Sequence, residues 1–145
     1  MRVDRVLLVL VLFSIVSLGV SVALLTVSVR IPSHGTLRCL GLGFFGDAAG
    51  SLPVSELDWG LVEPGGVVVV TVYARNNGTV SGVMGLTVSE WVPVLAGEYM
   101  NVTWNREGYV LPVDVIVPVT FTLRVSGLIH DVTSFRCSLL CNVEG

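Results

Sequence analysis

One stretch of this chain constrains its fold more than any other, because Val6 to Val29 contains no charged residue. As a helix rising 1.5 Å per residue it would reach about 36 Å, enough to cross the ~30 Å hydrocarbon core of a bilayer. Arg2 and Arg5 precede it, and so short a tail is more easily left in the cytoplasm than the long remainder of the chain. We expect a cytoplasmic tail at residues 1–5, a single-pass transmembrane helix in the cell membrane at residues 6–29, and a C-terminal domain outside.

The same stretch has a second interpretation. A basic start, an apolar run and small residues at Ser21-Val22-Ala23 also describe a secretory signal peptide cleaved near Ala23. The apolar run continues past Ala23 to Val29 and exceeds the usual signal-peptide core of about 7–15 residues, which favours the anchor. Both interpretations export the rest of the chain, with residues 30–35 as a short linker.

The charge pattern excludes one class of partner. Only 13% of the residues are charged, against about 25% in an ordinary soluble domain. All eight basic residues are arginines, and of the 11 acidic residues only Asp4 precedes the exported part, which is therefore acidic. Nucleic-acid phosphates need clustered Lys or Arg, and the arginines here are scattered, so we expect no nucleic-acid partner.

Alternating apolar and polar residues predict strands throughout the exported part. In Val67 to Asn76 the apolar residues Val70, Val72 and Ala74 alternate with more polar ones, the period of two of a half-buried strand. We expect Pro64-Gly65-Gly66 to form the turn before this strand, and Asn77-Gly78 to form a hairpin turn after it.

Similar patterns predict strands at residues 36–44, 57–59, 84–88, 101–105, 119–126 and 135–143. About seven short strands separated by turn residues are typical of an all-β sandwich. We expect residues 36–145 to form an immunoglobulin-like antiparallel β-sandwich, preceded by the transmembrane helix.

Several motifs together carry a resemblance: "FFGDAA", "ELDWGLVEPGG", "VTVYARNNG", "EWVP", "VTWN", "VTFTLRVSG" and "VTSFRCSLL". In this order they resemble a group of uncharacterised archaeal membrane proteins with one N-terminal span and one extracellular immunoglobulin-like β-sandwich. The resemblance covers most of residues 36–143 and implies that fold and location, with no activity to carry over. The chain departs from the group in its apolar, Cys-containing last strand.

Three cysteines raise the question of a disulfide, which export would permit. Cys137 and Cys141 would lie about 13 Å apart on one regular strand, too far for a bond that needs a Cα separation of about 4.4–6.8 Å. Cys39 could pair with Cys137 or Cys141 if the first and last strands are neighbours. Alternatively, all three are buried, small apolar residues. The sequence contains no close cluster of Cys and His residues, so we expect neither a metal site nor a cofactor.

Two other groups of residues could suggest chemistry. His130-Asp131 could be part of a catalytic arrangement, but no nucleophile motif accompanies the pair, and a polar turn is the simpler interpretation. The acidic residues Asp47, Glu56, Asp58 and Glu63 could bind calcium or hydrolyse a glycoside, yet they lack calcium-loop spacing. We expect Asp58 to accept hydrogen bonds from backbone N–H groups in a turn.

Two sequons could carry glycan on an exported surface, Asn77-Gly78-Thr79 at the expected hairpin tip and Asn101-Val102-Thr103 on an outward strand face. The three tryptophans could form a carbohydrate platform, but aromatic residues dominate core burial. We expect Trp59 and Trp104 in the core or a packed loop, and Trp91 closer to the surface.

These features favour a non-catalytic structural or interaction module, anchored in the lipid bilayer through residues 6–29 and working through protein partners at the cell surface. A second hypothesis is a secreted, pilus-like filament subunit. Cleavage near Ala23 would free an apolar segment, which could add as a strand to the next subunit. A surface hydrolase that uses the acidic loop is a third hypothesis.

Overall fold

The computed structural model describes residues 31–145, so the expected tail, the transmembrane helix or signal peptide, and Arg30 lie outside the described residues. Within this range the chain forms nine strands and one short helix, α2 (Ala96–Tyr99). The strands are β1 (Ile31–Leu40), β2 (Leu42–Phe45), β3 (Glu56–Val62), β4 (Val67–Asn76), β5 (Gly82–Val92), β6 (Met100–Trp104), β7 (Val110–Leu111), β8 (Ile116–Val125) and β9 (Phe135–Glu144). Within residues 31–145, no helix is long and apolar enough to cross a membrane.

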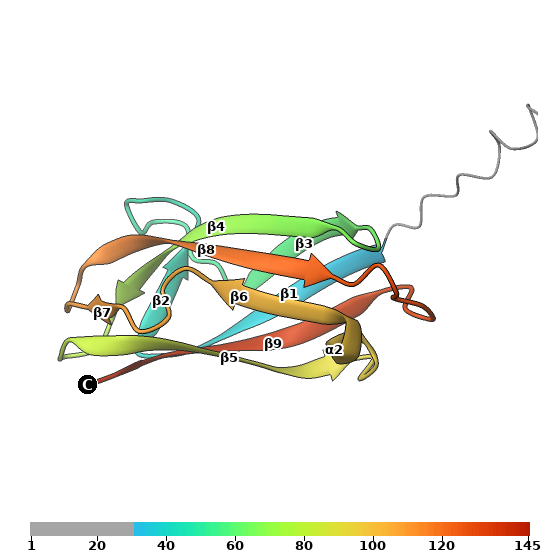
Figure 1. Ribbon diagram of the computed structural model, residues 1–145. Coiled ribbons are helices and arrows are strands. Elements are labelled where there is room, and N and C mark those ends of the chain that lie inside the picture. The colour runs from blue at the N-terminus through green and yellow to red at the C-terminus, as the bar shows by residue number, and fades with distance from the viewer. Residues whose placement is uncertain (1–30) are drawn as a thin grey trace, which may run out of the picture.

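The strands form two sheets that pack face to face. One sheet has five strands in the order β3-β1-β9-β5-β7, and the other has four in the order β2-β4-β8-β6. Figure 1 shows the two layers, with the start of β1 and the C-terminus at opposite ends of the sandwich. The all-β, two-sheet architecture expected from the sequence is confirmed.

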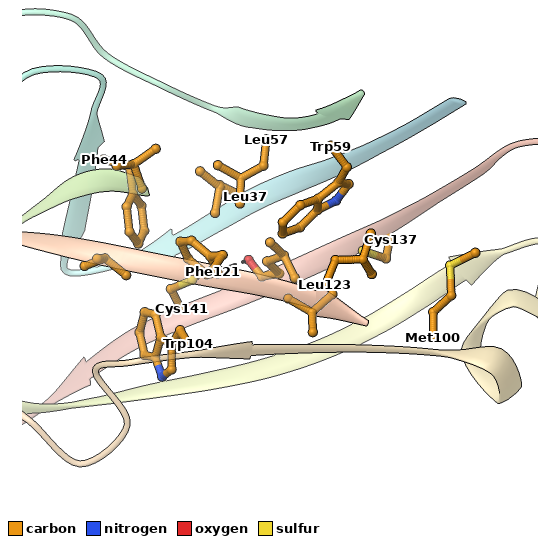
Figure 2. Packing of buried hydrophobic residues seen from close by; sticks show 14 of the residues in the cluster. Leu37, Phe44, Leu57, Trp59, Met100, Trp104, Phe121, Leu123, Cys137 and Cys141 are labelled. Carbon is orange, nitrogen blue, oxygen red and sulfur yellow. Dashed lines mark hydrogen bonds between the residues drawn. The ribbon is translucent and has the colours of Figure 1, made fainter. Parts of the chain in front are cut away.

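The core lies between the sheets and follows the expected alternation. Val119, Phe121, Leu123 and Val125 of β8 are buried. The Phe121 ring centroid lies 6.0 Å from that of Phe44 and 5.6 Å from that of Trp104, which brings three strands of the four-stranded sheet into one aromatic cluster (Figure 2). Burial of such rings is the main stabilising contribution of a sandwich core.

The first and last strands pair in parallel, contrary to the fully antiparallel sandwich that we expected. In the β1–β9 pair, Ser33 lies opposite Phe135 and Leu37 opposite Leu139. No hairpin joins these strands, because most of the chain lies between them, so no short turn requires them to run in opposite directions.

The strand expected at residues 36–44 is two strands in different sheets. β1 begins at Ile31, so residues 31–35, expected to be linker, are already part of the sheet. The strand ends before Gly41, whose φ of 75° is a left-handed conformation that glycine adopts without strain. The chain then enters the opposite sheet as β2, which pairs with β4.

The hairpin expected at Asn77-Gly78 is wrong, because β4 and β5 belong to different sheets. The connection crosses the sandwich and is organised by Asn76, which is buried. The Asn76 Nδ2 donates to the carbonyl oxygens of Val80 (2.9 Å) and Leu111 (3.0 Å), and its Oδ1 accepts from the Gly78 N–H (2.8 Å). Because both the nitrogen and the oxygen of the Asn76 amide have hydrogen-bond partners within the protein, this polar side chain can be buried at the end of β4.

The turn before β4 is confirmed. The Gly66 N–H donates to the Glu63 carbonyl oxygen (2.9 Å), and Gly65 has a φ of 75°. With Pro64 before that glycine, this is the pattern of a type II turn. It delivers the valine-rich β4 to the four-stranded sheet.

Candidate functional site: a groove on the outer face of the five-stranded sheet

A surface hollow lies on the outer face of the five-stranded sheet, near the end where β1 starts. It is a groove of about 580 Å³ that is lined by residues of β1, β3, the end of β5 and the start of β9. Its lining combines polar, charged and apolar side chains: Pro32, His34, Thr36, Glu56, Val92, Pro93, Ser134, Phe135 and Arg136. A mixture of this kind suits recognition of a group that is itself partly polar and partly apolar.

Strand alternation places the polar residues of the groove. On β1 the residues Ser33 and Leu37 are buried, so His34 and Thr36 project to the other face. On β9, Phe135 and Cys137 are buried and Arg136 projects outward. The register sets His34 directly opposite Arg136, which brings two side chains from distant parts of the sequence together.

One wall of the groove is the end of β5, where the strand is irregular. The register with β9 shifts between Ser89 and Val92, and Glu90 adopts a φ of 53°, which is uncommon for a residue other than glycine. Trp91 packs on Phe135 with a ring-centroid distance of 5.9 Å. The bulge therefore turns Glu90 over the sheet while Trp91 holds the strand against it.

Glu90 is held by two partners on the outer face. Its carboxylate forms a two-point ion pair with Arg38, with distances of 3.0 Å from Nη2 to Oε2 and 3.2 Å from Nη1 to Oε1. It also accepts a hydrogen bond from the Ser138 hydroxyl. A bidentate guanidinium–carboxylate pair fixes orientation as well as charge, so these three side chains form an ordered polar cluster on the same sheet face as the groove.

Arg136 differs from Arg38 in its surroundings. Over residues 31–145 the ion pairs are Arg38–Glu90, His34–Asp58 and His130–Asp131, and Arg136 takes part in none of them. The Arg136 side chain is exposed at the groove, beside the exposed apolar residues Val92, its direct neighbour on β5, and Pro93. Its guanidinium is thus available to a carboxylate from outside the chain.

His130 lies outside the groove. His130 and Asp131 lie in the loop between β8 and β9, as expected for a polar turn, and are 3.8 Å apart. The His130 ring lies edge-on to Tyr99, with centroids 5.2 Å apart, and both His130 and Asp131 are exposed. His34, for which we predicted no role from the sequence, is the histidine that lines the groove.

The acidic residues act locally. The Asp58 carboxylate accepts from the Gly60 N–H (2.8 Å), which confirms the expected backbone hydrogen bond. Asp47 accepts from the N–H groups of Ser51 and Leu52, both at 2.9 Å. The Ser51 hydroxyl also donates to Asp47, and this bond, followed by the Leu52 N–H, lowers the pKa of Asp47. Within the described part of the chain no three His, Cys, Asp or Glu residues are placed to hold a metal.

The cysteines divide into one exposed and two buried residues, and all three are free thiols in the structure. Cys39 lies directly opposite Cys141 in the β1–β9 pair, so the first and last strands are neighbours, as a disulfide to Cys39 would require. Burial raises the pKa of the Cys137 thiol to about 11 and raises the pKa of Cys141 further. Figure 2 shows both buried thiols in the core.

The two sequons lie at opposite ends of the four-stranded sheet. The Asn77 Oδ1 accepts from Arg75 Nε (3.0 Å), and a Cβ placed on Gly43 would lie 2.6 Å from Asn77 Nδ2, so the Asn77 side chain folds back on the sheet. Asn101 projects outward from the edge strand β6, as expected. Both asparagines are exposed, but the Asn77 amide is engaged by Arg75, whereas the Asn101 side chain has no hydrogen-bond partner among residues 31–145.

The tryptophans are mainly structural. Trp59 and Trp104 are buried, and Trp104 Nε1 donates to Glu107 Oε2 (2.7 Å). Trp91 is partly exposed and packs against Phe135 beside the groove. The three rings are thus core residues or wall supports, and no aromatic platform is formed.

The sequence alone did not indicate the groove. Arg136, Thr36 and Glu56 come from three strands, and only the pairing of β1 with β9 and β3 brings them together. One pattern in the sequence could have pointed to the groove: His34 near the start of β1 and Arg136 near the start of β9 both occupy outward positions. Comparison with known proteins identified no matching family, no matching curated protein and no matching solved structure.

Proposed function

We propose that this protein is a membrane-anchored, non-catalytic module that binds a protein partner outside the cell through the groove. The uncharged stretch Val6–Val29 supports the anchor, and β1 begins at Ile31, only one residue after it. A sandwich joined so closely to a span would be held at the membrane surface. This arrangement suits a cell-surface interaction protein.

The observation that carries the proposal is Arg136, which has no ion-pair partner among residues 31–145 and stands beside the apolar side chains of the groove. A partner segment that presents a carboxylate next to an apolar side chain would complement it. The neighbouring Arg38–Glu90 pair adds an ordered polar rim.

The test uses the full chain in native membranes with a photo-crosslinking residue in place of Thr36. We expect a discrete protein adduct, lost when Arg136→Glu is added and kept when Arg124→Glu is added. Arg124 is a matched control, because it is also exposed on a strand but lies in the other sheet. Equal crosslinking with either arginine variant, or from a probe at Thr122 on the other sheet, would contradict the proposal.

We infer an immunoglobulin-like sandwich, supported by two facing sheets, connections that cross between them and a first strand pairing with the last. The resemblance to archaeal membrane proteins with one span and one such domain agrees with this assignment.

One observation favours the filament hypothesis as a second candidate. β2 pairs only with the Tyr73–Asn76 half of β4, so within the described chain residues 67–72 have a partner strand on the β8 side alone. The exposed side chains of Val67 and Val69, at 53% and 58% accessibility, lie on this half of β4. An open, valine-rich edge is a template for an added strand.

The filament hypothesis predicts different results. The mature protein should begin near Leu24, and Val69→Lys should dissolve assemblies seen by electron microscopy, because a charge on an edge opposes strand addition. Val110→Lys, at another exposed valine, is the control. A first peptide that still contains residues 6–29 would exclude this candidate.

A further inference from the structure

We propose that Cys39 and Cys141 form a disulfide that joins the first strand to the last, while Cys137 remains a thiol. The two residues are direct partners in the parallel β1–β9 pair. The inference goes beyond the proposed function, because it concerns a covalent modification and stands whether or not the groove binds a partner.

The strand geometry brings the two residues within bonding range. Directly opposite residues on neighbouring strands are about 4.7–4.9 Å apart, and a disulfide needs Cα atoms about 4.4–6.8 Å apart. Alternation also puts both on the inner side: Cys39 follows buried Leu37 by two residues, and Cys141 follows buried Leu139 by two. The two side chains therefore share one face of the sheet.

The position of Cys39 near the end of β1 favours closure. It is followed only by Leu40 before Gly41, whose left-handed φ of 75° takes the chain out of the sheet. A strand end next to such a break can shift by the small distance that bond formation needs. Cys39 is also exposed, so an oxidising reagent can reach it, whereas Cys141 is buried.

Electrostatics gives a second indication that the two sulfur atoms are close. Burial raises the pKa of Cys141, and the neighbouring Cys39 raises it further because two thiolates repel each other. Cys39 is open to solvent, but its partial burial raises its pKa as well.

Cys137 is excluded by register. Its direct partner on β1 is Gly35, which has no side chain to bond, and Cys137 is separated from Cys141 by about 13 Å along β9. Cys137 is buried, so it is also shielded from a reagent in solution.

The chemistry requires a two-electron oxidant, which we take to be a disulfide of the thiol–disulfide exchange class. The Cys39 thiolate attacks the reagent disulfide, forms a mixed disulfide and releases one reagent thiolate. The Cys141 thiol then loses its proton and attacks the Cys39 sulfur, which releases the second reagent thiolate. Two protein thiols are oxidised to one disulfide, and the reagent is reduced to two thiols.

The test counts thiols in the full chain, taken from native membranes into acid to stop exchange and then alkylated in denaturant. The wild type should take one label before reduction and three after it. Cys137→Ser should take none before reduction, and Cys39→Ser and Cys141→Ser should each take two. Trypsin would place Cys39 in peptide 39–75 and both other cysteines in peptide 137–145, which should remain joined without a reductant.

Three results would overturn the inference. They are three labels on the unreduced wild type, no label on unreduced Cys141→Ser while the wild type takes one, and a disulfide-linked dimer of the full chain. The second result would identify Cys137 as the partner of Cys39, and the third would mean that the bond joins two copies.

Discussion

Gly35 of β1 lies directly beneath the indole ring of Trp59 on the neighbouring strand β3. A Cβ placed on Gly35 would be 3.2 Å from Trp59 Nε1 and 3.3 Å from Leu139 Cδ1. Trp59 is buried, and its Nε1 has no hydrogen-bond partner among the described residues. The ring therefore occupies the space that the absent side chain leaves, and packing alone positions it.

We expect Gly35→Ala to destabilise the sandwich by about 1–3 kcal/mol, the usual range for overpacking a filled core. The indole ring and Leu139 would both have to move, and either movement disturbs the sheet interface. Urea unfolding of the full chain in detergent, followed by tryptophan fluorescence, measures the change.

Gly127→Ala is the matched control for this prediction. The nearest atom to a Cβ at Gly127 would be 4.0 Å away, and Gly127 is exposed in the loop after β8. We expect a change within about 0.5 kcal/mol. Equal stability of the two variants would show that the Trp59 ring can relax around an added methyl group.

Asn76 gives a second prediction, because its amide joins three segments of the crossing between the sheets. Replacement by Ala would leave the buried Leu111 carbonyl, the Val80 carbonyl and the Gly78 N–H without their partner. We expect a loss of about 1–3 kcal/mol or more, since each unsatisfied buried group adds a desolvation penalty. Thermal unfolding by circular dichroism measures this loss.

The neighbouring Asn77→Ala is the control, because the Asn77 side chain is exposed and, among residues 31–145, hydrogen-bonds to Arg75 Nε alone. Its effect should stay below about 1 kcal/mol. A larger effect for Asn77 than for Asn76 would mean that the exposed Asn-Gly pair organises the crossing after all.

The sequence predicted individual strands well, because alternation depends on neighbouring residues only. In β8 and β9, both predicted as strands, alternating apolar residues such as Phe121 and Leu139 are buried. The Pro64-Gly65 turn was also predictable, because a φ above zero needs glycine at that position.

Sheet membership was not predictable from the same patterns. Asn77-Gly78 is a strong hairpin signal, yet the chain crosses to the other sheet there, because buried Asn76 is bonded to Leu111 beyond the turn. Likewise, Gly41 inside an apolar run hides the break between β1 and β2. The groove depends on the β1–β9 register, a relation between residues about a hundred positions apart that no local pattern contains.

The two sequons should be modified unequally if the domain is exported. Asn101 projects from an edge strand, whereas the Asn77 side chain bonds to Arg75 and packs over Gly43. We expect glycan at Asn101 at higher occupancy than at Asn77 in protein from native membranes. Glycopeptide mass spectrometry measures both occupancies.

Thr103→Ala and Thr79→Ala are paired controls, because each removes one sequon and keeps its asparagine. Only Thr103→Ala should remove most of the glycan mass. Higher glycan occupancy at Asn77 than at Asn101 would contradict the prediction. A chain with no glycan at either site would mean that glycosylation gives no support for export.

The buried Cys137 thiol should make the fold sensitive to alkaline pH. Burial raises the pKa of Cys137 from 9.0 to about 11 because the thiolate is poorly solvated in the core. The unfolded chain therefore releases this proton near pH 9, and the folded chain releases it near pH 11. Between these values the folded state holds more protons than the unfolded state, so stability is retained below pH 9 and falls as pH rises towards 11.

Cys137→Ala should therefore lose less stability than the wild type between pH 9 and 11, although its smaller side chain lowers stability at neutral pH. Urea midpoints of both proteins at pH 7.5, 9, 10 and 11 measure the difference, which isolates the contribution of residue 137. With Cys39 and Cys141 replaced by serine, absorbance at 240 nm follows the Cys137 thiolate after subtraction of the same titration of a variant that also lacks Cys137. A thiolate that forms in the folded protein with a midpoint near pH 9 would show that water reaches Cys137 between the sheets.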